Sequence, residues 1–98
     1  MFAIILAAAA LITAIVLVVL NWERIVSWFK GHEELLESDK DNIAVAIKQA
    51  MDDGNVTYVQ GIFNKRTNKL GEAAKYEAEE LDQETLNKHK GKDLIIVT

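Results

Sequence analysis

The first 20 residues form an almost unbroken apolar run, with Thr13 as the single polar interruption and no charged side chain. A helix rises about 1.5 Å per residue, so this run matches the ~30 Å thickness of a hydrocarbon core. A cleaved signal peptide fits less well, because no Lys or Arg precedes the run and the small residues of Ala7–Ala10 lie in its middle. The pattern therefore predicts a retained, single transmembrane helix.

Aromatic and basic residues follow this run, as they do where a helix leaves a membrane. The residues predicted at the membrane interface are Trp22, Arg24, Trp28, Phe29 and Lys30. We expect the helix to continue to about Lys30, which gives an anchor over residues 1–30. Basic residues occur only on the C-terminal side of the run, so the positive-inside tendency places the rest of the chain in the cytoplasm.

Small residues recur along the apolar run at spacings of three and four. The members of this stripe are Ala3, Ala7, Ala10 and Ala14. Small side chains on one helix face allow two membrane helices to approach closely. The stripe predicts self-association or contact with another membrane protein, although alanine is also ordinary filler in membrane helices.

An acidic connector over residues 31–41 leads to a region with five predicted elements. Apolar residues at helical spacing predict a helix over residues 42–53. Alternating residues over 56–64 and 69–78, joined by a polar turn with Asn68 at its end, predict a β-hairpin. Asp82 is a suitable N-cap for a helix that ends near Lys90, and a short apolar run over 94–97 predicts a last strand.

These elements predict an α+β fold, with a transmembrane helix followed by a small α-β-β-α-β domain over residues 42–98. The right-handed crossover rule places the last strand beside the first strand of the hairpin. The expected domain is a two-layer sandwich whose three-stranded antiparallel sheet has the order 2-1-3, with both helices on one face.

The chain has a formal net charge of −4, which argues against a nucleic-acid partner. The predicted topology nevertheless gathers basic side chains from the hairpin turn and the last helix end at one pole of the sheet. The basic pole consists of Lys65, Arg66, Lys69, Lys88, Lys90 and Lys92. Such a pole favours contact with anionic lipid or a small anionic ligand. The simpler interpretation is a solvated turn and lysines that complement a helix dipole.

No catalytic, metal or cofactor motif is evident in the sequence. The chain has no cysteine, and its two histidines, His32 and His89, lie far apart, so both are expected to be exposed. The glycines are isolated and do not form a phosphate-binding loop. Gln60 is expected to face solvent, and Gly61 to mark a β-bulge. We therefore predict a protein that is not an enzyme and that uses no cofactor.

The sequence thus favours a single-pass membrane protein that acts as an interaction, scaffold or regulatory module. Its expected partners are membrane lipid and either another membrane protein or a second copy of itself. The alternative is a membrane-tethered sensor that binds a small anionic ligand or anionic lipid at the basic pole.

Overall fold

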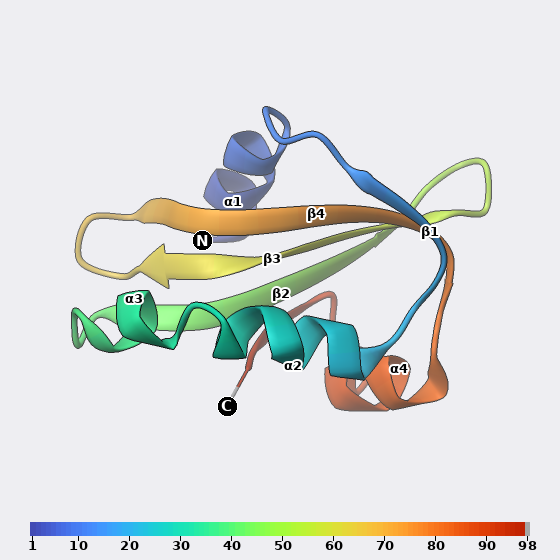
Figure 1. Ribbon diagram of the computed structural model, residues 1–98. Helices are drawn as coiled ribbons and strands as arrows, with labels where there is room; N and C mark the ends of the chain where they lie inside the picture. Colours follow the sequence, from blue (N-terminus) through green and yellow to red (C-terminus); the bar gives the residue numbers. More distant parts are fainter. Residues whose placement is uncertain (98) are drawn as a thin grey trace.

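A computed structural model describes residues 1–97 and contains one five-stranded sheet in the order β1-β4-β3-β2-β5. The strands are β1 (Ile15–Leu20), β2 (Asn42–Ala50), β3 (Val56–Asn64), β4 (Lys69–Leu81) and β5 (Leu94–Ile96). The helices are α1 (Phe2–Ala9), α2 (Trp22–Lys30), α3 (Glu33–Glu37) and α4 (Gln83–His89). Helix α1 covers one face of the sheet, and α2 lies across the other (Figure 1).

The predicted transmembrane helix is wrong, because the apolar run divides into two elements. Helix α1 has only 8 residues, and the chain then turns into β1, which pairs in parallel with β4. Across residues 1–97, no helix is both long enough and apolar enough to cross a membrane. The β-branched residues of β1 favour a strand, and the edge of β4 satisfies their backbone groups. The membrane-anchored function, and the cytoplasmic location inferred from the anchor, are therefore not supported.

The helix predicted over residues 42–53 is also wrong, since residues 42–50 form strand β2. This strand lies between β3 and β5 and is buried on both faces. Ala44 and Ala46 belong to the core beneath α2, whereas Val45 and Ile47 belong to the core beneath α1. A strand buried on both faces has apolar residues at every position, so helical spacing occurs within it by chance.

The hairpin of β3 and β4 is confirmed, and its turn places Asn68 at a positive φ of 57°. The last helix and the last strand also lie where they were predicted, as α4 and β5, but the predicted strand order is wrong. The last strand, β5, pairs antiparallel with β2 and not with β3, so the sheet has five strands in a different order. The helices lie on both faces of the sheet, whereas the sequence predicted that they share one face.

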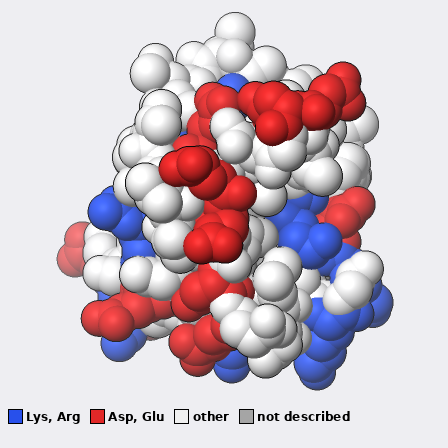
Figure 2. Space-filling view, turned by 90° about the vertical axis from the view of Figure 1, so that its right-hand side faces the viewer, with Lys and Arg blue, Asp and Glu red and all other residues white. Residues whose placement is uncertain are grey.

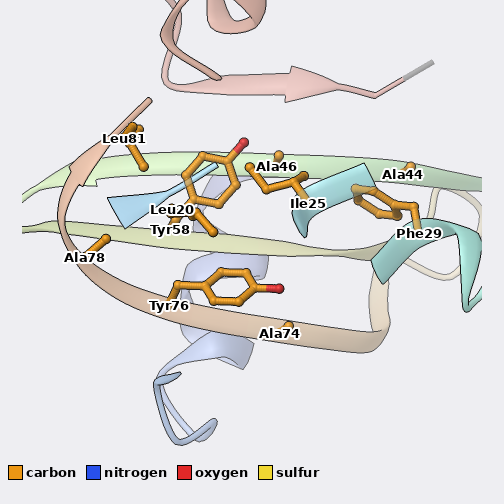
Figure 3. Packing of buried hydrophobic residues seen from close by; sticks show 10 residues of the cluster. All are labelled: Leu20, Ile25, Phe29, Ala44, Ala46, Tyr58, Ala74, Tyr76, Ala78 and Leu81. Carbon is orange, nitrogen blue, oxygen red and sulfur yellow. The ribbon is translucent and has the colours of Figure 1, made fainter. Parts of the chain in front are cut away.

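Two apolar cores lie on the two faces of the sheet. The core under α2 contains Ile25 and Phe29 from the helix, with Tyr58 and Tyr76 from the sheet (Figure 3). The second core is built around Ile5 and Ala9 of α1. The first core carries the site described next, because α2 does not cover all of it.

Candidate functional site

A groove of about 840 Å³ opens between α2 and β5, on the face of the sheet that α2 covers. Its walls come from α2, from the start of α3, from the C-terminal end of α4 and from β5. The lining residues are Met1, Trp22, Val26, Phe29, Lys30, Glu33, Leu36, Ala44, Lys88, His89, Lys90, Lys92 and the segment from Leu94 to Val97. Its volume is within the range of small-molecule sites in proteins.

The inner surface of the groove is apolar because of how α2 and β2 meet. Helix α2 is amphipathic and buries Ile25 and Phe29 against the sheet, where Phe29 lies near Ala44 (Figure 3). Ala44 has a small side chain, so it leaves space between the sheet and the helix at this point. Ile95 and Val97 complete the apolar wall on the other side.

Lysines surround this apolar surface. Lys30 ends α2, and Lys88, Lys90 and Lys92 come from the C-terminal end of α4 and the segment after it. The Lys88 ammonium lies 5.8 Å from the ring centre of Trp22, which is close enough for a cation–π contact. Glu33 is the one acidic side chain among the lining residues that the structure describes, so the groove has a net positive rim.

Acidic side chains are concentrated elsewhere. Figure 2 shows the end of the molecule where β4 meets α4, and a band of Asp and Glu runs down it beside patches of Lys and Arg. Among the residues that line the groove, however, lysines outnumber carboxylates, so its local charge is positive although the whole chain is acidic.

The buried side chain of His89 fixes the segment that carries three of these lysines. Its Nε2 lies 2.7 Å from the Tyr58 hydroxyl, and its Nδ1 lies 3.0 Å from the carbonyl oxygen of Lys92. The backbone turns sharply here, with positive φ angles of 52° at Lys90 and 80° at Gly91. His89 was predicted to be exposed, and this is wrong, because it is fully buried.

A second buried network holds α2 on the sheet. The amide nitrogen of Gln60 donates to the carbonyl of Ile25 at 2.9 Å, and the hydroxyl of Tyr76 donates to Gln60 Oε1 at 2.7 Å. Gln60 is fully buried, so the expectation that it faces solvent is wrong. The bulge expected at Gly61 lies instead in the paired strand β4, because Ile62 alone lies opposite Gly71 and Glu72 where the register shifts.

The residues predicted at a membrane interface all lie on α2, which packs on the sheet. Trp22, Phe29 and Lys30 line the groove. Arg24 and Trp28 line a separate, polar hollow of about 530 Å³ on the other side of the helix. The clustering of these five residues in the sequence reflects an amphipathic helix, whose apolar face packs on the protein's own core.

The predicted alanine stripe is interrupted. Ala3 and Ala7 are exposed on α1, whereas Ala10 follows the end of the helix and Ala14 precedes β1. The residues that α1 presents to the sheet are Ile5 and Ala9. The stripe does not form the continuous seam that a longer helix would have made.

The two halves of the basic pole are separated. Lys65, Arg66 and Lys69 lie at the β3–β4 turn, beside the first residue of β2. The other three lysines lie near Lys48 of β2, because the Lys48 amide donates to the backbone carbonyl of Asp93, which follows Lys92, at 2.9 Å. Six residues of strand separate these points, a distance of about 20 Å. Arg66 also pairs with Asp39 at 2.7 Å and Asp41 at 3.3 Å, and the hydrogen bonds and charge of these pairs raise its pKa. Only Lys88, Lys90 and Lys92 reach the groove.

Sequence reasoning missed His89 and Gln60 as organising residues. The signal that was available is the polar residue inside an apolar strand, since Gln60 lies between Val59 and Gly61 in β3. Comparison of the chain with protein-family models, with curated proteins and with solved structures found no match.

Proposed function

We propose that the protein is a binding module whose groove holds a small amphipathic anion, such as a carboxylate with an aliphatic or aromatic body. The observation that carries the proposal is the combination of an apolar inner surface with a rim of four lysines in a groove of about 840 Å³. An apolar body would displace water from the partly exposed side chains of Val26, Leu36 and Ile95. An anionic head group would lie among the lysines, where charge-assisted hydrogen bonds are available.

Binding rather than catalysis is proposed because the histidine of the groove is already fully engaged. Both ring nitrogens of His89 have hydrogen-bond partners, Tyr58 and the Lys92 carbonyl. A general base needs a free ring nitrogen within reach of the substrate proton. The role of His89 that this geometry supports is to position the lysine-bearing segment.

Isothermal titration calorimetry with two matched probes tests the proposal. Decanoate and decyltrimethylammonium have the same tail length and opposite head charges. We expect decanoate to bind and decyltrimethylammonium to bind far more weakly, because the lysines attract one head group and repel the other. We also expect decanoate affinity to fall as salt is added, since these lysines are exposed. Equal affinity for the two probes, or no binding of decanoate, would overturn the proposal.

A pair of charge-matched variants locates the site. Lys88→Gln with Lys92→Gln removes two charges from the groove, and Lys65→Gln with Lys69→Gln removes two from the distant turn. At roughly 0.5–1 kcal/mol for each of the two exposed contacts, the groove variant should bind decanoate about fivefold to thirtyfold more weakly. The turn variant should bind almost as the unmodified chain does. An equal loss in both variants would mean that the net charge, and not the groove, controls binding.

A further inference from the structure

Strand β1 forms an apolar, uncharged edge of the sheet that is 6 residues long. It pairs with β4 on one side, and no strand lies on its other side in the described chain (Figure 1). Its sequence is IVLVVL, and Val16 and Val18 are 77% and 67% exposed. The backbone amides and carbonyls on the outer side of an edge strand are free to pair with another strand.

Natural edge strands are commonly protected by charges, proline, bulges or short length. Strand β1 has none of the first three protections, whereas the opposite edge, β5, has only 3 residues. The exposed apolar surface also continues past the strand, because Leu11 is 91% exposed. Surfaces of this kind on folded proteins mark interaction sites.

We propose that two copies of the chain pair antiparallel through β1, so that their sheets join into one sheet with five strands from each copy. The chemistry of β1 favours its own copy as the partner. A partner strand with charged residues is disfavoured, because β1 has no opposite charge to pair with them and burying an unpaired charge beside β1 would be costly. A two-fold antiparallel pair places β-branched residues opposite β-branched or leucine residues, which is a favourable cross-strand arrangement.

The charges near β1 do not oppose its pairing. The strand itself has no charged residue, and the nearest charged residues in sequence, Glu23 and Arg24, lie on α2 after the chain has left the sheet. Strand β1 therefore brings no charge of its own to the junction between two copies.

Strand β1 also keeps apart the carboxylates of β4, which include Glu77 and Glu80. With strands about 4.8 Å apart, the two β4 strands of the pair are separated by about 14 Å. This distance exceeds the screening length of ~8 Å at physiological ionic strength. The acidic net charge therefore does not prevent pairing at that salt concentration, and pairing should weaken when salt is removed.

Sedimentation velocity on the full chain tests the proposal. We expect a dimer at micromolar concentration, which dissociates on dilution and as salt is lowered. Val16→Lys with Val18→Lys should give a monomer, because each lysine opposes strand addition. The fold should tolerate this change, since position 16 lies beside Glu77 and both side chains are exposed. Circular dichroism checks that the variant keeps its secondary structure.

Ile96→Lys on β5 is the matched control, because it places a lysine at the other edge of the sheet, where Ile96 is 53% exposed. It should leave the dimer intact. Amide hydrogen exchange gives a measurement without mutation, in which β1 amides become more protected as the protein concentration rises. A monomer at all concentrations, open-ended assembly, a dimer that survives the Val16→Lys, Val18→Lys change, or dissociation by Ile96→Lys would each overturn the proposal. Decanoate binding by the β1 variant keeps this test separate from that of the groove.

Discussion

The hydroxyl of Tyr58 donates a hydrogen bond to Nε2 of His89 across 2.7 Å, and both side chains are fully buried. The second ring nitrogen, Nδ1, faces the carbonyl oxygen of Lys92, which can only accept. The carbonyl fixes a proton on Nδ1, and in the neutral ring Nε2 accepts from the Tyr58 hydroxyl. The Nδ1 proton holds the lysine-bearing segment against the end of α4.

This arrangement makes the stability of the fold depend on pH. Burial lowers the pKa of His89 below its ordinary value of 6.5, because the charged imidazolium would lose its hydration. Below about pH 6.5 the unfolded chain binds a proton at this residue and the folded chain does not, so unfolding is favoured. We expect the urea midpoint to be constant above about pH 7 and to fall progressively from about pH 6.5 towards pH 5.

Two histidine variants check the source of this pH dependence. His89→Gln should flatten the slope of stability between about pH 7 and pH 5, even if it lowers stability at all pH values. His32→Gln should leave the slope unchanged, because His32 lies at the end of α2, away from the buried network. A slope that persists in His89→Gln would show that another group titrates.

The sequence was sufficient for the elements whose signals are local. The β3–β4 hairpin follows from alternation on both sides of a polar turn, with Asn68 adopting the positive φ expected of it. The start of α4 follows from Asp82, whose carboxylate caps the helix. In each case the decisive contacts join residues that are close in sequence, so the pattern alone contains them.

The elements that failed depend on partners distant in sequence. Strand β2 is buried by α1 on one face and α2 on the other, so its apolar residues lose the alternation typical of a half-buried strand. The N-terminal run divides because β4 continues to Leu81, which gives Leu20 a backbone partner. The burial of Gln60 and His89 likewise arises only when α2 and α4 cover the sheet.

Asp82 joins the starts of two helices, so its replacement should destabilise the fold. Its carboxylate accepts from the amide and hydroxyl of Thr85 in α4, and from the amide of Trp22 at 3.3 Å in α2. Partial burial alone would raise the pKa of Asp82, but these hydrogen bonds outweigh it and hold the pKa below 3.8. We expect Asp82→Ala to reduce the free energy of unfolding by about 1–2 kcal/mol, as measured by urea denaturation.

Asp82→Asn separates the cap from the charge. Asparagine has a single side-chain oxygen, so it can keep the hydrogen bonds from Thr85 but not the bond from Trp22, which Asp82 accepts on its other oxygen, and part of the stability should return. With Asp82 intact, its contribution is present above about pH 4 and is lost as the pH falls through its lowered pKa. Glu84→Gln, on the exposed first turn of α4, should change stability little. A large effect of Glu84→Gln would show that the helix dipole, and not the cap, is responsible.

Gly61 and Gly71 provide a matched test of the close approach between β3 and the bulge in β4. A Cβ added at Gly61 would lie 2.8 Å from Leu70 Cδ1 and 3.0 Å from the carbonyl oxygen of Glu72, so the backbone of β4 would have to move. At Gly71 the nearest atom is 3.5 Å away, which is ordinary contact. We expect Gly61→Ala to lower the free energy of unfolding by about 1–3 kcal/mol and Gly71→Ala to have little effect. Equal effects in urea denaturation would contradict the close approach at Gly61.

The bonds of Gln60 to Tyr76 and to the carbonyl of Ile25 should make its replacement costly. Gln60→Met keeps the size of the side chain but leaves a buried hydroxyl and a buried carbonyl without their partner. We expect it to reduce the free energy of unfolding by about 2–4 kcal/mol. Adding Tyr76→Phe removes the stranded hydroxyl, so the double variant should be more stable than the sum of the two single changes indicates. Additive losses in urea denaturation would show that the Gln60 and Tyr76 side chains are not coupled.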